Sequence, residues 1–203
     1  MGRKALLAAG AAALLAVLTF GLGMTGLLGP DEPRYASIAR EMAESGDWLT
    51  PRLWTEGEDQ ARRAPWFEKP PLLYWLGAAG FRAGLGPELA PRLPVALVSW
   101  GFVLFFWWAV RRLEGTAVAT AAALMLGTSA GWAAYSVIAV TDLPLAAAFN
   151  AALLLGLLRL KGGGRGFAVG AGVAFGLALL AKGLVAGVLA LPLVTSQIGR
   201  AHV

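Results

Sequence analysis

Cysteine is absent from this 203-residue sequence, and histidine occurs only once, at His202. The absence of cysteine excludes disulfides and thiolate metal sites, although it does not identify a cellular compartment. Charged residues are also scarce, at 14%, whereas 58% of the residues are hydrophobic. This composition is too apolar for an ordinary soluble domain and indicates an all-α, polytopic membrane protein. A span needs about 20 apolar residues, so the chain has room for about five or six.

Acidic residues are nearly confined to one stretch of the chain. Of the 12 acidic residues, only Glu114 and Asp142 lie outside residues 31–88. Basic residues instead punctuate the apolar runs, so the formal charge of +5 is better explained by membrane topology than by nucleic-acid binding. The polar stretch between the first two apolar runs is therefore the region around which the chain is organised, and we predict no nucleic-acid partner.

The apolar runs predict six membrane spans. A cleaved signal peptide is the alternative for the first run, but that run is long for a signal sequence. The third run is long enough to be interrupted near Gly131 and Trp132. The predicted spans cover residues 5–28, 93–110, 116–140, 143–159, 167–181 and 184–194.

Short basic segments predict the orientation of these spans. If the spans alternate, the segments at residues 3–4, 111–112 and 159–165 fall on one side, which the positive-inside rule assigns to the cytoplasm. Residues 29–88 then form a large extracytoplasmic loop, for which the rule is weak because the loop is long. Asp31, Glu68, Lys69, Asp142 and Lys182 are all expected on this extracytoplasmic face.

Within the loop, residues 31–45 have the pattern of an amphipathic helix. We expect Pro33 at its first helical position, an apolar stripe that includes Tyr35 and Met42, and Gly46 at its end. Residues 65–71 predict an extended, proline-rich approach to a second apolar stretch, residues 72–85. That stretch is short and contains Arg82, so it favours a surface or re-entrant helix over a span.

The last six residues break the apolar pattern. Residues 198–203 match one reading frame of a common sequencing-library adapter, so we expect an artefactual tail after residues 1–197. We therefore do not assign His202 as a metal ligand or base.

Several charged residues could carry chemistry, and each has a structural alternative. Asp31 could act as a base or simply stabilise a helix N-terminus together with Glu32. Glu68 could ligate a hard divalent ion and Lys69 a phosphate, or the two could form an interfacial salt bridge. Asp142 could be functional or cap the fourth span, and Lys182 could meet a lipid headgroup or snorkel to the surface.

An ordered set of short motifs runs through the chain. The motifs are Asp-Glu-x-Arg-Tyr (31–35), Ala-Arg-Glu-Met (39–42), Gly-Asp-Trp (46–48), Phe-Glu-Lys-Pro-Pro-Leu-x-Tyr-Trp (67–75), Ala-x-Arg-Leu-Pro (90–94), Thr-Asp (141–142) and Ala-Lys-Gly (181–183). As a set they resemble the N-terminal part of the aminoarabinose-transferase and protein O-mannosyltransferase group, whose members are polyprenyl-phosphate-dependent glycosyltransferases of the GT-C fold. One departure is Leu184, where the group usually has proline.

The resemblance implies roles for particular residues. It implies that Asp31 and Asp142 are catalytic acids and that Glu68 binds a divalent metal ion as cofactor. It also implies substrate-binding roles, which fall on Arg34, Tyr35, Lys69 and Lys182. The family's later spans, soluble C-terminal domain and metal-binding histidine are missing, so we expect these 203 residues alone to be inactive.

The implied reaction transfers a sugar from a polyprenyl-phosphate donor to an acceptor, either a lipid of the lipid A type or a protein. The protein would lie in a bacterial inner membrane, in contact with membrane lipids. The active site would face the periplasm. An anionic phosphate leaving group needs nearby cations, and an acceptor hydroxyl needs a carboxylate base. The alternative is a transporter or scaffold that uses Asp142 and Lys182 as an intramembrane charge pair. A transporter has no need of the long external loop.

Overall fold

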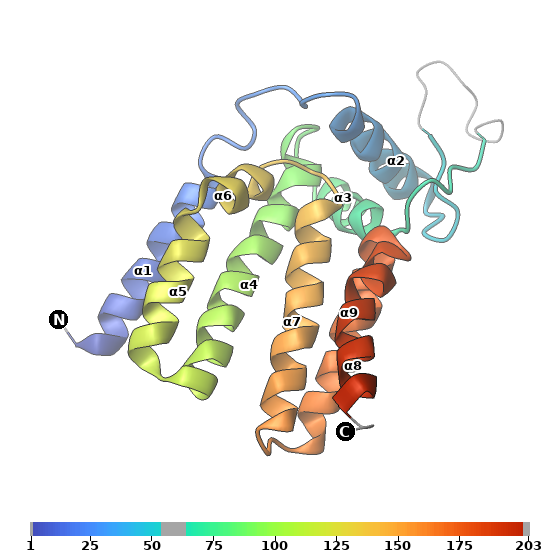
Figure 1. Ribbon diagram of the computed structural model, residues 1–203. Coiled ribbons are helices and arrows are strands. Elements are labelled where there is room, and N and C mark those ends of the chain that lie inside the picture. The colour runs from blue at the N-terminus through green and yellow to red at the C-terminus, as the bar shows by residue number, and fades with distance from the viewer. Residues whose placement is uncertain (1, 54–63, 201–203) are drawn as a thin grey trace.

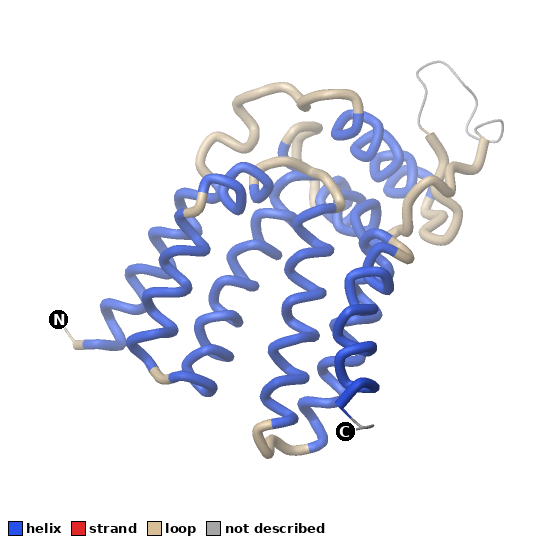
Figure 2. The backbone as a smooth tube through the Cα atoms, viewed as in Figure 1, coloured by secondary structure: helices blue, strands red, loops and turns tan. Residues whose placement is uncertain are grey.

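The chain forms a helical bundle capped at one end by shorter helices. In the computed structural model, which describes residues 2–53 and 64–200, every regular element is a helix (Figures 1 and 2). The helices are α1 (Arg3–Thr19), α2 (Asp31–Ser45), α3 (Leu72–Arg82), α4 (Leu89–Glu114), α5 (Thr116–Thr128), α6 (Ala130–Ser136), α7 (Asp142–Leu160), α8 (Arg165–Lys182) and α9 (Val185–Arg200).

The long helices lie side by side, and α2, α3 and α6 lie at one end of them (Figure 1). The α4–α5 and α7–α8 connections lie at the opposite end, as does the start of α1. The prediction that the short basic connections lie at one end of the bundle and the polar loop at the other is therefore confirmed. We call the end that carries α2 and α3 the capped end.

Three helices of the described part are long and apolar enough to cross a membrane: α4, α7 and α8. The helices α5 and α6 add a fourth span if they count as one, since they pass the same test together and are bent by 60° at Ser129. The interruption predicted in the third span is present, a few residues earlier than Gly131-Trp132. The prediction of five or six spans also counted residues 5–28 and 184–194. These form α1 and α9, which have 17 and 16 residues and are shorter than the helices that pass this test.

Two boundaries differ from the sequence predictions. The first span was predicted to reach residue 28, but α1 ends at Thr19. The reason is tertiary, because the carbonyl groups of Leu22, Thr25 and Gly26 accept hydrogen bonds from a side chain of α4 instead of continuing the helix. Pro33 is the third residue of α2 rather than the first. It is tolerated there because amides of a first helical turn have no intrahelical partner.

The predicted amphipathic helix is confirmed in α2. Tyr35, Ile38 and Met42 are buried in one apolar cluster that also contains Leu73 and Tyr74 of α3. Gly46 ends the helix in the left-handed conformation, with φ of 76°, and its N–H bonds to the Met42 carbonyl. The helix therefore lies with its apolar face on α3.

Two glycines let α3 pack closely between α2 and α4. A methyl group added at Gly77 would lie 2.8 Å from Cβ of Ala39, and one at Gly80 would lie 2.2 Å from the carbonyl oxygen of Ala90. Backbones this close need residues without a side chain. The short helix predicted at residues 72–85 is thus α3, which packs between α2 and α4.

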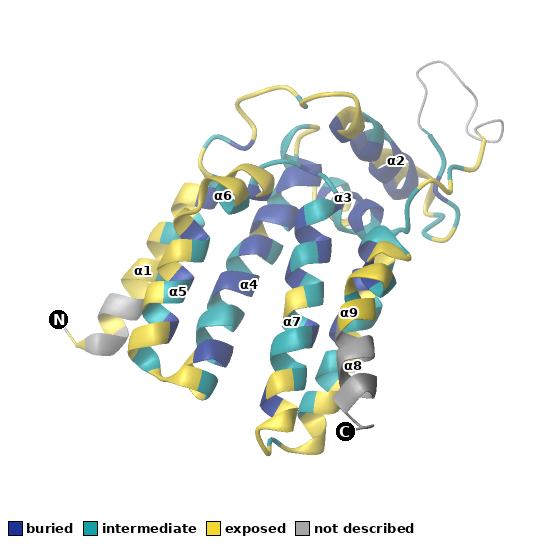
Figure 3. Cartoon of the chain, in the orientation of Figure 1, coloured by how far each residue is buried: buried dark blue, intermediate teal, exposed yellow. Residues whose placement is uncertain are grey.

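Burial is greatest at the capped end and along the inner faces of α4 and α7 (Figure 3). The outward side chains of the bundle are large and apolar, with Val169 and Val173 of α8 more than 60% exposed, at 67% and 61%. Apolar surface of this kind on long apolar helices suits contact with lipid. The chain is an integral membrane protein.

Candidate functional site

The segment before α3 brings Glu68 to the side chain of Arg34 and holds Lys69 beside Glu68. Arg34, in the first turn of α2, lies 3.2 Å from the Glu68 carboxylate and 3.5 Å from that of Asp31. The Lys69 ammonium lies 3.3 Å from Glu68. The Arg34 guanidinium also lies over the ring of Trp66, 5.8 Å from its centre. Two cations and two carboxylates thus form one cluster at the capped end.

Asp142 and Lys182 form a second charged group. Asp142 begins α7, Lys182 ends α8, and the two helices pack as an antiparallel pair. Because the first residue of α7 and the last residue of α8 lie at the same level, the Lys182 ammonium reaches the Asp142 carboxylate at 2.5 Å. Both side chains keep solvent exposure, at 26% for Lys182 and 48% for Asp142.

An open hollow of about 520 Å³ brings the two groups together. Glu68, Lys69 and Lys182 line it, together with apolar side chains such as Phe67 and Leu184. Gly183 has a φ of +63°, and this backbone conformation, which glycine adopts without strain, places the turn after α8 beside Pro70. Two lysines far apart in sequence therefore face one cavity with mixed polar and apolar walls. We call it the lysine hollow.

A second hollow of about 300 Å³ lies between α6 and α7, and Asp142 is among the residues that line it. We call it the aromatic hollow because two aromatic side chains contribute to its wall. Its lining residues are Gly131, Trp132, Tyr135, Asp142, Leu143 and Ala146.

Tyr35 lies beneath the first cluster and not on its surface. Its side chain is buried, and its ring packs on that of Tyr74 with centres 5.9 Å apart. Burial, and then the nearby carboxylates of Asp31 and Glu68, raise the pKa of the Tyr35 hydroxyl. The hydroxyl therefore stays protonated at neutral pH and available as a hydrogen-bond donor.

Glu68 keeps its negative charge. Its pKa is lowered, chiefly by the Lys69 ammonium and also by the Arg34 guanidinium. Its carboxylate is an oxygen donor of the type that hard divalent ions prefer. Among residues 2–53 and 64–200, however, no group of three or more potential metal-binding side chains surrounds it. The described residues thus offer too few donors for a metal site of their own, and the metal role of Glu68 stays a prediction.

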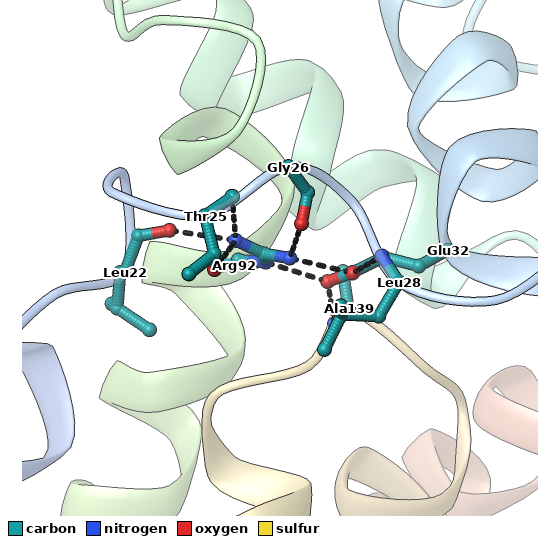
Figure 4. A network of polar contacts seen from close by, with 7 residues as sticks. All are labelled: Leu22, Thr25, Gly26, Leu28, Glu32, Arg92 and Ala139. Carbon is teal, nitrogen blue, oxygen red and sulfur yellow. Dashed lines mark hydrogen bonds and ion pairs between the residues drawn. The ribbon is translucent and has the colours of Figure 1, made fainter.

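The structure also contains a buried ion pair that the sequence reasoning missed. Arg92 of α4 donates to both carboxylate oxygens of Glu32, at 2.7 and 2.8 Å, and both side chains are essentially inaccessible to solvent (Figure 4). Asp31 and Glu32 do lie in the first turn of α2, but neither caps it with a side-chain hydrogen bond, and Glu32 binds Arg92 instead. The motif Ala-x-Arg-Leu-Pro contains Arg92, but only the apolar surroundings of this arginine hinted at a buried partner.

This pair connects three segments near the charged clusters. The Glu32 carboxylate accepts hydrogen bonds from the backbone N–H groups of Leu28 and Ala139, at 2.6 and 2.8 Å. Ala139 lies three residues before Asp142, and Glu32 is adjacent to Asp31. The network therefore holds the backbone next to both predicted catalytic acids.

The capped end thus combines three exposed carboxylates, three cations and a cavity with apolar walls. Cations beside an apolar cavity can hold the phosphate of an amphiphilic lipid, and a nearby carboxylate can accept a proton.

The residues at 198–200 belong to α9, whereas His202 and its two neighbours lie outside the described residues, as do residues 54–63 of the predicted loop.

Comparison with protein families identifies similar sequences. A family model described as dolichyl-phosphate-mannose-protein mannosyltransferase matches residues 68–200. The undecaprenyl phosphate-alpha-4-amino-4-deoxy-L-arabinose arabinosyl transferase 1 of Sodalis glossinidius is 32% identical over 92% of this chain and 33% of its own length. The corresponding transferase of Aeromonas hydrophila is 32% identical over 83% of this chain and 30% of its own length.

Solved structures agree with this similarity. The crystal structure of ArnT from Cupriavidus metallidurans bound to undecaprenyl phosphate matches with a TM-score of 0.84 and 32% identity, over 98% of this chain and 37% of that one. Its apo state matches with a TM-score of 0.83 and 33% identity, over 97% and 36%. The chain spans about a third of the length of the relatives it matches.

Proposed function

This chain belongs to the GT-C family of polyprenyl-phosphate-dependent glycosyltransferases, in the aminoarabinose transferase group, and we propose that it transfers a sugar from a polyprenyl-phosphate donor to a lipid acceptor. The lysine hollow is the observation that best supports this proposal. Lys69 and Lys182 face one cavity whose other walls are largely apolar. Such a cavity suits an anionic phosphate attached to a hydrocarbon chain.

The proposed reaction is a displacement at the anomeric carbon of the sugar. An acceptor oxygen forms a bond to this carbon while the bond to the lipid phosphate breaks, and the bonding electron pair leaves with the phosphate oxygen. Lys69 and Lys182, with Arg34 nearby, stabilise the negative charge on the departing phosphate. These cations are already held beside the cavity by Glu68 and Asp142, so little rearrangement is needed.

The acceptor decides whether a base is needed. An acceptor phosphate, as in lipid A, is already a nucleophile, whereas a protein hydroxyl would have to lose its proton to Asp31 or Asp142. The names of the relatives concern arabinosyl transfer from undecaprenyl phosphate, which supports a pentose donor. A lipid of the lipid A type is the proposed acceptor, as the resemblance to the aminoarabinose transferase group implies. Protein as acceptor is the second candidate, suggested by the description of the matching family model.

Two further assignments belong to this proposal. The first is a divalent ion with Glu68 as one ligand. Glu68→Gln should weaken Mn²⁺ binding to the intact protein, and no step of the reaction above depends on that ion. The second is location in the bacterial inner membrane with the capped end in the periplasm, as the short basic connections at the opposite end suggest.

A transfer assay tests the proposed function directly. The intact protein is reconstituted in lipid nanodiscs with undecaprenyl phosphate-4-amino-4-deoxy-L-arabinose and lipid A, and the modified lipid is measured by mass spectrometry. We expect transfer that is lost in Lys69→Ala and retained in Lys161→Ala, a lysine at the opposite end of the bundle. A wild-type protein that binds donor but never transfers its sugar would contradict the proposal. That result would instead favour the alternative function, a transporter or scaffold that uses the Asp142–Lys182 pair.

A further inference from the structure

The end of the bundle opposite the capped end carries two arginines that lie against tryptophan rings. The guanidinium of Arg111 lies 5.3 Å from the centre of the Trp107 ring, and that of Arg112 lies 4.7 Å from the centre of the Trp108 ring. Each arginine follows its tryptophan by four positions in α4, so each pair lies on one face of the helix. We call these four residues the arginine–tryptophan patch.

Both rings are held in place by neighbouring helices. The indole N–H of Trp107 donates to the hydroxyl of Thr120 in α5, at 3.2 Å. The ring of Trp108 packs on that of Phe167 in α8, with ring centres 6.3 Å apart. The distances within the patch are in the range of attraction between a cation and an aromatic face. The fixed rings therefore restrict the two guanidiniums as well.

The stacking leaves the hydrogen-bonding groups of Arg111 and Arg112 available. Both residues are exposed, and in the part of the chain that the structure describes neither side chain forms an ion pair or a hydrogen bond. A guanidinium has its N–H donors in a planar fork, so its edge can bind two oxygens of one phosphate while its face lies on a ring. Arginines that are already fixed lose less freedom on binding than arginines that extend into water.

Other basic residues surround the patch with positive charge. The Lys161 ammonium bonds to the carbonyl group of Leu113 and to the carboxylate of Glu114, at 3.3 and 3.0 Å, which attaches the α7–α8 connection to the end of α4. Arg159 and Arg165 flank this connection, and both are exposed. Among the described residues Glu114 is the only carboxylate at this end, and Lys161 already pairs with it. The excess charge is therefore positive.

The position of the patch along α4 places it at the surface of the membrane. It lies in the last two turns of a helix that is long and apolar enough to span, beside the α4–α5 connection (Figure 1). Tryptophan is enriched where the apolar core of a bilayer meets the headgroups. An arginine at a helix end usually extends toward water, but each of these lies beside a ring that is one turn nearer to the middle of the span. The guanidiniums thus lie at the level of lipid phosphates.

We propose that the arginine–tryptophan patch binds an anionic phospholipid of the adjacent leaflet. The headgroup phosphate lies between Arg111 and Arg112, and the acyl chains follow the apolar surface of α4 and α8. This inference goes beyond the proposed function and does not depend on it. In the orientation proposed above, the leaflet is the cytoplasmic one.

The charge and the surroundings of the patch favour this occupant over others. A zwitterionic lipid brings a cation of its own next to the arginines, so the patch should select a headgroup with net negative charge. A soluble acidic protein could satisfy the arginines but would leave the apolar surface beside them uncovered. A second copy of this chain would bring the same positive charge to the contact, which is unfavourable.

The test compares two lipids that have the same acyl chains and different headgroup charge. Dioleoyl phosphatidylglycerol and dioleoyl phosphatidylcholine are added separately to the intact protein in detergent micelles, and native mass spectrometry measures each dissociation constant. We expect wild-type protein to bind phosphatidylglycerol about tenfold more tightly or better. Arg111→Gln with Arg112→Gln should reduce this preference to about twofold. Arg111→Lys with Arg112→Lys keeps the charge, and with it the orientation in the membrane, and should retain most of the preference.

Two controls separate the patch from other positive charge. Arg159→Gln with Arg165→Gln removes the same charge from the same end without changing a stacked arginine, so the preference should stay within about twofold of wild type. Lys69→Ala removes a cation from the lysine hollow, where a phospholipid could also bind, and should leave the preference unchanged.

Three results would overturn the inference. They are equal affinity of wild type for the two lipids, a loss in either control as large as in the glutamine pair at 111 and 112, and a lysine pair as weak as that glutamine pair. Native mass spectrometry also detects a bound second copy of the chain, and a dimer that the glutamine pair dissociates would replace the lipid by a protein partner. Sugar transfer is measured separately, so the proposed function stands whichever result is obtained.

Discussion

Glu32 and Arg92, which are 60 positions apart in the chain, form a fully buried ion pair with two hydrogen bonds of 2.7 and 2.8 Å. The remaining donors of Arg92 bond to carbonyl groups of the α1–α2 connection, and the carboxylate of Glu32 binds the amide of Ala139. Every group in this network is thus satisfied by another member. Removal of one member leaves buried polar groups without partners, which is costly in a low-dielectric environment.

We predict that Glu32→Gln and Arg92→Met each destabilise the protein by about 3–5 kcal/mol, the usual cost of breaking a buried pair. The double variant should recover only part of this loss, because the carbonyl groups that Arg92 binds remain unpaired. Unfolding in detergent micelles measures both effects. The matched control is Lys161→Met with Glu114→Gln, an exposed pair 3.0 Å apart that should contribute less than about 1 kcal/mol. Single variants as stable as the control would show that the pair is dispensable.

The same pair predicts how stability depends on pH. Burial tends to raise the pKa of Glu32, but hydrogen bonds from Arg92 and from the amides of Ala139 and Leu28 outweigh it, so the pKa is lowered. A carboxyl group with a lower pKa in the folded state stabilises the protein fully above the unfolded value of about 4.3. That stabilisation is lost as the pH falls through the folded pKa. The difference in thermal midpoint between wild type and Glu32→Gln should therefore shrink from about pH 7 to about pH 3; a constant difference would contradict this.

Asp31→Asn separates chemistry from structure. The Asp31 carboxylate is 54% exposed and contacts Arg34 at 3.5 Å, and it caps no helix. We expect the variant to lose transfer by about 100-fold or more while its thermal midpoint stays at the wild-type value. Asp47→Asn is the control, because the Asp47 carboxylate accepts hydrogen bonds from backbone N–H groups of the turn that follows α2 and lies outside the two charged groups of the site. Wild-type turnover by Asp31→Asn would remove Asp31 from the catalytic residues.

Lys69 should determine the affinity for the donor lipid. Lys69→Ala removes one of the two lysines of the lysine hollow, and we expect undecaprenyl phosphate to bind about tenfold more weakly or worse. Lys69→Arg should restore only part of the affinity, because a planar guanidinium differs in shape from an ammonium. Titration of the lipid in nanodiscs measures both variants. Equal affinity in Lys69→Ala and wild type would exclude the phosphate role.

The orientation in the membrane can be measured because the chain contains no cysteine. We predict that Ser45→Cys, at the exposed end of α2, reacts with a membrane-impermeant maleimide from the periplasmic side. Gly164→Cys, in the α7–α8 connection, should react only from the cytoplasmic side. Gly164 has open space for a side chain, so the substitution is tolerated. The reverse pattern of labelling would invert the topology.

Local features of the fold could be predicted well from the sequence. Continuous apolar runs determined α4, α7 and α8, and the basic residues between them placed alternate connections at one end. The position of Gly46 predicted the end of α2, and the spacing of Tyr35 and Met42 predicted its buried face. These features depend on helical periodicity and on the length of a membrane span, which neighbouring residues in the chain determine by themselves.

Only the tertiary structure decided which charged groups meet. Arg92 looked no different in sequence from the other basic residues next to apolar runs, yet it is the buried partner of Glu32. Likewise, the sequence offered Asp142 and Lys182 as a charge pair only under the transporter alternative, and it is the lengths of α7 and α8 that bring both side chains to one level. The sequence determined which residues lie at the capped end, because spans alternate. Their pairing depends on the rotation of each helix about its axis and on close packing at Gly77 and Gly80, which no single segment specifies.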